Sequence, residues 1–178
     1  MNITEETIVK SYPKIALNVL ITLLFSLMIY TPLFAAESLK TRLIDISGWE
    51  AEPAMEMEMN MNGVKMLNAT RSYEKGDNTI DAAIMVTSQQ MGMASFQGMN
   101  MSSGGIKIES SEMDGLKIMH THDSNENEGN IMVLLGETET NSAIFSLGYS
   151  GISGKESMAI LKQYNLKQIQ NATNALMK

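Results

Sequence analysis

In residues 54–62 (AMEMEMNMN), methionines at every second position alternate with polar residues. A period of two predicts a β-strand with one apolar face. Asn62-Gly63 follows directly and is a strong signal for a tight hairpin turn, so 64–74 is predicted to be the returning strand. A polar turn at 75–78 leads to a third strand over 79–87. This part of the chain is therefore expected to form an antiparallel meander.

Four further segments have the composition of strands. They are 106–113, 116–123, 130–137 and 142–149. Asp114-Gly115 predicts a tight turn between the first two of them. Residues 131–135 (IMVLL) are all apolar, which is typical of a central strand that is covered on both faces.

Helices are predicted at the C-terminal end of the chain. One begins near Ser153, and a second turn or helix spans 166–177 with apolar residues at helical spacing. Residues 88–105 predict a short irregular helix with a glycine-rich exit, because their apolar residues do not alternate and Gly92 and Gly98 weaken a regular helix. This order of elements predicts an α+β fold with one antiparallel sheet of about six to seven strands, packed by helices.

A long apolar run without a charged residue spans 15–36. Lys10 and Lys14 precede it and two alanines end it, which is the pattern of a secretory signal peptide. The run has about 20 residues, so it could also span a bilayer as an uncleaved anchor in the inner membrane. Residues 1–36 are therefore expected to be a signal peptide or membrane anchor, and 37–178 a single exported, periplasmic domain. Contact with a membrane is expected only through the uncleaved run.

Composition excludes several classes of function. The chain has 20 Asp and Glu against 13 Lys and Arg, a net charge of −7, so we expect it to bind neither nucleic acid nor anionic lipid. It has no cysteine, which excludes disulfides, cysteine–zinc sites and thiol chemistry. Nucleophile-elbow, Walker A and zinc-protease motifs are also missing, which favours a non-catalytic domain over an enzyme.

Methionine is unusually frequent, at 17 of 178 residues. Thioether sulfur is a soft ligand that selects Cu(I), and same-face neighbours on a strand are about 6.6 Å apart. Methionine is also a flexible core filler. The regular alternation in 54–62 favours core packing there, whereas glycines leave a later group of methionines in a more open region. The candidate metal ligands of that group are Met91, Met93, Met99 and Met101.

His120 and His122 are the two histidines of the chain, and they alternate on one predicted strand. Their side chains are expected on the same face as Leu116 and Ile118. Two imidazoles at this spacing can hold Cu(II), zinc or nickel if a third ligand is added, such as Asp123 or a methionine. The alternative is a pair of half-exposed strand histidines beside a polar turn.

Four features carry a resemblance to known proteins. They are Gly48-Trp49 at the start of the domain, the methionine-rich strand 55–61, the segment 71–77 (RSYEKGD), and a C-terminal amphipathic helix closed by Asn165-Leu166. Over most of 48–177 the chain resembles a group of uncharacterised exported bacterial proteins. The order of its elements is similar to that of PsbP-like domains, which implies an antiparallel sheet sandwiched by helices. Neither resemblance implies an activity, because a fold does not fix a function.

These observations predict a non-catalytic exported domain that binds or scaffolds something in the cell envelope, with a protein as its expected partner and no cofactor. The alternative is a soft-metal protein that binds Cu(I) or Ag(I) through methionines, with His120 and His122 as further ligands. A third hypothesis, a hydrolase, requires a cleft in which a serine lies within reach of one of these histidines.

Overall fold

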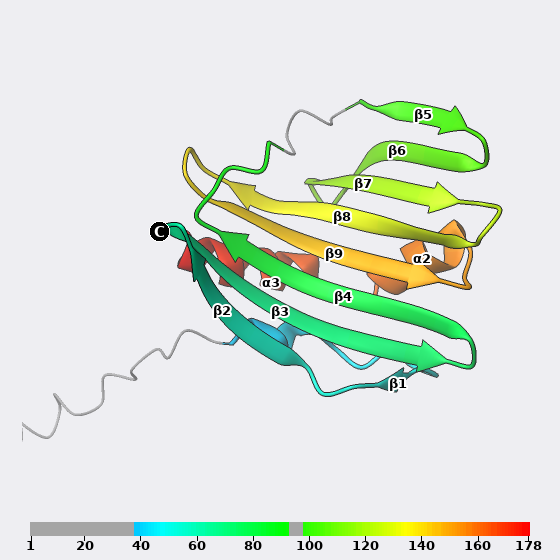
Figure 1. Cartoon of the computed structure of the whole chain (residues 1–178), viewed down its shortest axis with the longest axis horizontal. Helices are drawn as coiled ribbons and strands as arrows, with labels where there is room; N and C mark the ends of the chain where they lie inside the picture. The colour runs from blue at the N-terminus through cyan, green and yellow to red at the C-terminus, as the bar shows by residue number, and fades with distance from the viewer. Residues whose placement is uncertain (1–37, 93–97) are drawn as a thin grey trace, which may run out of the picture. The chain divides into compact units, whose positions relative to one another are not determined.

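The computed structural model describes residues 38–92 and 98–178, all within a unit that spans Ala36–Lys178. These residues form one nine-stranded antiparallel sheet in the order β1-β3-β4-β9-β8-β7-β6-β5, with β2 also paired to β3 (Figure 1). The strands are β1 (Glu50–Ala51), β2 (Met55–Met61), β3 (Val64–Lys75), β4 (Asn78–Thr87), β5 (Asn100–Ser103), β6 (Ile106–Met113), β7 (Leu116–Asp123), β8 (Glu128–Glu137) and β9 (Ser142–Ser150). The helical segments are the 3-10 helix η2 (Leu39–Arg42) and the α-helices α2 (Gly154–Leu161) and α3 (Leu166–Leu176).

All seven predicted strands are confirmed, and the α+β class with them. The sheet is nevertheless larger than the six to seven strands predicted, because β1 and β5 join it. The helix predicted over 88–105 is wrong for the described residues, because 88–92 are not helical and 100–103 form strand β5; residues 93–97 lie outside the described residues. Asn100–Ser103 pairs with β6 through a turn at Gly104 and Gly105, whose φ angles of 60° and 96° suit glycine. The glycine pair is therefore a hairpin signal rather than a helix exit.

Both predicted C-terminal helices are confirmed. The Ser153 side chain caps α2 by accepting a hydrogen bond from the Glu156 amide at 3.2 Å, and the Asn165 side chain caps α3 by accepting one from the Gln168 amide at 3.1 Å. Such caps satisfy backbone donors that have no partner in the first turn. In Figure 1, η2, α2 and α3 all lie behind the strands, on one face of the sheet. We call this the helix face, and the other the open face.

The hydrophobic core lies between the helix face and the helices. It is built from alternate residues of the central strands and from the inner sides of α2 and α3. Its fully buried side chains include Tyr73, Ile80, Ile84, Val133, Phe145, Leu147, Leu161 and Ile169. Among the described residues, no helix lies on the open face (Figure 1).

Strand β8 is central, as its apolar run predicts, and it lies between β9 and β7. The expectation that it is covered on both faces is not met by the described residues. Ile131, Val133 and Leu135 are buried towards the helices, whereas Met132 and Leu134 are only half-buried on the open face.

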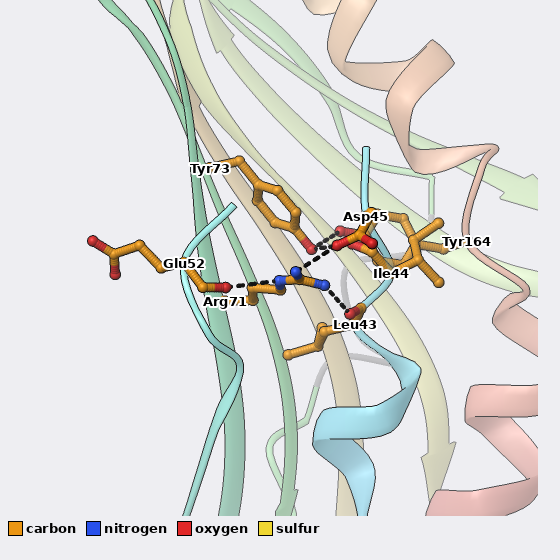
Figure 2. A network of polar contacts seen from close by, with 7 residues as sticks. All are labelled: Leu43, Ile44, Asp45, Glu52, Arg71, Tyr73 and Tyr164. Carbon is orange, nitrogen blue, oxygen red and sulfur yellow. Dashed lines mark hydrogen bonds and ion pairs between the residues drawn. The ribbon is translucent and has the colours of Figure 1, made fainter. Parts of the chain in front are cut away.

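The segment before β1 is tied to the sheet by Arg71 of β3 (Figure 2). The guanidinium donates hydrogen bonds to the carbonyl oxygens of Leu43 at 2.8 Å and Glu52 at 2.9 Å, and it pairs with the Asp45 carboxylate. The Arg71 side chain thus binds three residues of the segment that precedes β2, namely Leu43, Asp45 and Glu52.

Two tyrosines extend the same network into the core. The Tyr73 hydroxyl donates to the Ile44 carbonyl oxygen at 2.7 Å, and the Tyr164 hydroxyl donates to that of Tyr73 at 3.0 Å (Figure 2). Burial raises the pKa of both phenols above the ordinary tyrosine value. Both groups are therefore neutral at physiological pH, and each keeps the proton that it donates.

No helix within 38–92 or 98–178 is long and apolar enough to cross a bilayer. The leader predicted over 15–36 lies outside the described residues. Export of the domain stays a prediction from the sequence.

Candidate functional site

Strand β2 presents its methionines to solvent. Met55, Met57 and Met61 are 65%, 60% and 69% exposed. The expectation that the methionines of 54–62 pack in the core is therefore wrong. They lie on the open face, which the described helices leave uncovered.

Glu56 of β2 contacts the segment around η2. Glu56 lies opposite Ala69, a core residue, and so points to the helix face. There its carboxylate accepts hydrogen bonds from the hydroxyl of Ser38, the residue before η2, at 2.9 Å and from the amide of Lys40 within η2 at 3.1 Å. The side of β2 that carries Glu56 therefore faces η2, and the methionines lie on the other face of the sheet.

Pairing between β2 and β3 brings three thioethers together. Met59 lies opposite Met66, and Met57, which pairs with Asn68, is the diagonal neighbour of Met66. Opposite side chains on one face have Cβ atoms about 5 Å apart and diagonal ones about 7–8 Å, which flexible methionines can bridge. We call Met57, Met59 and Met66 the thioether cluster. Met85 of β4 lies one strand further, also opposite Asn68.

The methionines predicted as ligands do not gather at one point. The Met91 amide donates to the Ser142 hydroxyl at the start of β9 at 2.9 Å, whereas the Met99 carbonyl oxygen accepts from the Ser110 amide on β6 at 3.0 Å. Three inter-strand steps of about 4.8 Å each separate β9 from β6. Met101 lies on β5 at the far edge of the sheet, and Met93 lies outside the described residues.

His120 and His122 share the helix face with Leu116 and Ile118, as predicted. Met101 pairs with Ile108, and its register places it on the open face. A mixed site of Met101 with the two histidines is therefore not assembled, because the sheet lies between them.

A third ligand for the histidines is also missing from the expected place. Asp123 alternates with His122 and so lies on the other face, where its carboxylate accepts a hydrogen bond from the Asn125 amide at 2.8 Å. In the described ranges 38–92 and 98–178, no group of three or more histidine, aspartate or glutamate side chains could hold a metal ion. This arrangement does not favour a zinc, nickel or Cu(II) site at His120 and His122.

The two histidines are instead joined by Tyr149 of β9. Its hydroxyl oxygen lies 2.8 Å from Nε2 of His120 and 2.9 Å from Nδ1 of His122. A hydroxyl carries one proton, so it donates to one ring and accepts from the other. The pattern of residues along the sequence did not indicate that Tyr149 belongs to this group. The three side chains form one hydrogen-bonded set across β7 and β9.

Gly129 of β8 makes this set possible. In the register it lies between His122 of β7 and Tyr149 of β9. A Cβ atom at position 129 would lie 2.4 Å from the Tyr149 hydroxyl oxygen and 2.2 Å from the Thr121 carbonyl oxygen. The tyrosine ring can therefore cross β8 towards the histidines only because this residue has no side chain. A glycine within a strand pattern is the sequence signal for such a close approach.

A cleft of about 650 Å³ opens over the histidines, between α2 and the helix face of β6 and β7. Its lining includes Lys107 and Glu109 from β6 and Lys155, Met158 and Lys162 from α2. Ser153 also lines the cleft, but its hydroxyl accepts the hydrogen bond that caps α2, and each histidine has one ring nitrogen on Tyr149. The hydrolase hypothesis gains no support from this arrangement, because neither histidine is hydrogen-bonded to a serine within the described residues.

Burial sets the protonation of the bridged set. Partial burial lowers the pKa of His120, and the neighbouring His122 and Lys107 lower it further, while Glu109 acts in the opposite direction. Burial raises the pKa of Tyr149. The set therefore favours a neutral His120 beside a protonated phenol.

This depressed pKa predicts a loss of stability in mild acid. The unfolded chain, in which His120 has its ordinary pKa near 6.5, binds a proton more readily than the folded one. The free energy of unfolding should therefore fall as the pH drops below about 6.5, before the carboxylates titrate. Urea unfolding of His120→Gln at pH 7.5 and 5.5 should show a smaller difference than wild type. An equal difference would contradict the role of His120.

Comparisons with known proteins give no family for this chain. No model of a protein family matches it, and no curated protein and no solved structure matches it either. The resemblances to exported bacterial proteins and to PsbP-like domains stay predictions. The described residues offer two surfaces for binding, the thioether cluster and the cleft.

Proposed function

We propose that this chain is an exported, non-catalytic binding domain whose thioether cluster holds a soft monovalent metal ion, Cu(I) or Ag(I). The observation that carries the proposal is the place of the cluster on the open face, where Met57 is 60% exposed and Met59 and Met66 are half-buried. Methionine that serves as core filler is buried, and here the core lies on the other face. Exposed thioethers in a row are available as ligands.

The donor set supports a soft ion. Met59 and Met66 face each other across β2 and β3, and Met57 is within diagonal reach, so three sulfur atoms can converge on one ion. Thioethers prefer Cu(I), whereas zinc, calcium and magnesium prefer imidazole or oxygen. The carboxylates of β2 lie on the helix face, so they do not offer a hard site beside these sulfurs.

A second candidate function uses the same face for a protein partner. Half-buried apolar side chains continue from the thioether cluster across the open face, among them Met85, Met119, Met132 and Leu134. Methionine-rich surfaces adapt to many apolar partners. This candidate retains the expectation of an envelope partner, and it differs from the metal proposal in one testable respect. A Met→Leu change keeps apolar surface but removes the sulfur ligand.

The test is an anaerobic titration of the protein with Cu(I) against a chromogenic chelator that competes for the ion. We expect one ion to bind with at least micromolar affinity, and the variant Met57→Leu/Met59→Leu/Met66→Leu to bind at least about tenfold more weakly. The matched control is Met119→Leu/Met132→Leu, which changes an opposed pair on the same face and should bind as wild type.

Two results would overturn the metal proposal. Wild-type protein that never competes with the chelator has no soft-metal site. An equal loss in the triple variant and its control would place the site away from the thioether cluster. A partner that binds wild type and the triple variant equally well would favour the second candidate.

A further inference from the structure

The cleft over His120 and His122 is positively charged in a chain that is acidic overall. Lys107, Lys155 and Lys162 line it, and the one lining carboxylate among the described residues, Glu109, lies 2.7 Å from the Lys107 ammonium group. Lys155 and Lys162 have no carboxylate partner within the described part of the chain. Uncompensated ammonium groups around one concave surface attract anions, even though the whole chain carries −7.

The α2 wall of the cleft carries charge at both ends and apolar surface between them. Lys155, Met158, Ala159 and Lys162 are spaced i, i+3, i+4 and i+7, which places them on one side of the helix. At a rise of 1.5 Å per residue, the two lysines are about 10 Å apart along the axis. A ligand that matches this wall has an apolar body as well as a negative charge.

The floor of the cleft adds hydrogen-bonding groups. Tyr149 bonds one nitrogen of each imidazole, and the second nitrogen of each ring has no protein partner in the described part of the chain. Gly154 brings α2 close to this floor, since a Cβ atom there would lie 3.0 Å from Cε1 of His120. The rings are therefore fixed in position, and the ring that accepts the tyrosine proton keeps an N–H that can donate to an oxygen of the ligand.

We propose that this cleft binds an amphiphilic organic anion, such as a medium-chain carboxylate. The negative head lies at the lysines and the imidazoles, and the apolar body lies against Met158 and Ala159. The volume, about 650 Å³, is within the range of about 300–1,000 Å³ that small-molecule sites occupy. The cleft is on the helix face and the thioether cluster is on the open face. Anion binding in the cleft can therefore be tested independently of metal binding at the cluster.

The two histidines provide a direct reporter, because they are the only ones in the chain and both line the cleft. Decanoate is titrated into the full chain, in the form that expressing cells accumulate, while the imidazole C–H resonances are followed by NMR. We expect both histidines to shift with one saturable curve. The same titration with decylamine, which has a similar body and the opposite charge, and with acetate, which has the head alone, should leave them almost unmoved.

Substitutions then locate the site. Lys155→Gln/Lys162→Gln should weaken decanoate binding at least about tenfold, whereas Lys117→Gln/Lys167→Gln, which removes two positive charges outside the cleft, should not. Ala159→Trp, which fills the cleft without changing its charge, should abolish the histidine shifts. The proposal is overturned if decanoate leaves the histidines unmoved, if decylamine shifts them equally, or if both lysine pairs weaken binding to the same extent.

Discussion

Arg71→Met is expected to lower the free energy of unfolding by about 3 kcal/mol. The guanidinium donates to two backbone carbonyl oxygens, those of Leu43 and Glu52, and hydrogen bonds from a charged group contribute about 1.5–3 kcal/mol each. Methionine fills part of the same space but leaves both carbonyl oxygens without this donor. The Arg71 side chain is 16% exposed, so water replaces these bonds only in part.

The ion pair with Asp45 is expected to contribute much less. The Asp45 side chain is 87% exposed, and exposed ion pairs contribute between zero and about 1 kcal/mol. Asp45→Asn should therefore stay within about 1 kcal/mol of wild type. Arg71→Lys should lie between the two variants, because a single ammonium group cannot reach both carbonyl oxygens and the carboxylate in this geometry.

Urea unfolding measures the global effect, and amide hydrogen exchange locates it. Exchange should accelerate first in residues 43–52, which the guanidinium ties to β3 (Figure 2). A loss of stability in Arg71→Met below about 0.5 kcal/mol, or faster exchange spread evenly over the sheet, would contradict this account. An Asp45→Asn variant as unstable as Arg71→Met would move the main contribution to the ion pair.

Alternation along the chain predicted the strands and their hairpins, but not which face of each strand is covered. In β2 one face is formed by methionines and the other by glutamates and an asparagine. The apolar character of methionine favoured the methionine face as the buried one. In the folded chain Glu56 accepts hydrogen bonds from Ser38 and Lys40, which lie 16 to 18 residues away in the sequence. Alternation along a strand cannot predict a contact at that separation, because it describes the strand and not the segments that pack against it.

The histidine site was predicted in part. Placing His120 and His122 on one face needs only the local period, and the structure confirms that placement. Tyr149 and the lysines of α2 could not be assigned to the same site, because their position depends on the order β7-β8-β9 and on the helix packed over it. Gly129 was the one local signal, since a glycine inside a strand marks a close approach without naming the residue that approaches.

Gly129→Ala is expected to lower the free energy of unfolding by about 2–3 kcal/mol. The added methyl group would lie 2.2 Å from the Thr121 carbonyl oxygen and 2.4 Å from the Tyr149 hydroxyl oxygen. The first of these neighbours is backbone in a paired strand, so it cannot rotate away, and β7 and β8 must separate locally. Gly129 does not have a positive φ, so the cost comes from this overlap and not from an unfavourable backbone conformation.

Gly148→Ala is the matched control for this prediction. It lies on the neighbouring strand β9, and a Cβ atom there would meet only ordinary contacts near 3.9 Å. It should be neutral or stabilising by up to about 1 kcal/mol, because alanine restricts the unfolded chain. Urea unfolding gives both values, and the imidazole NMR signals should move only in Gly129→Ala. A Gly129→Ala protein as stable as Gly148→Ala would show that β8 can shift to accommodate the methyl group. The cleft would then not require glycine at position 129.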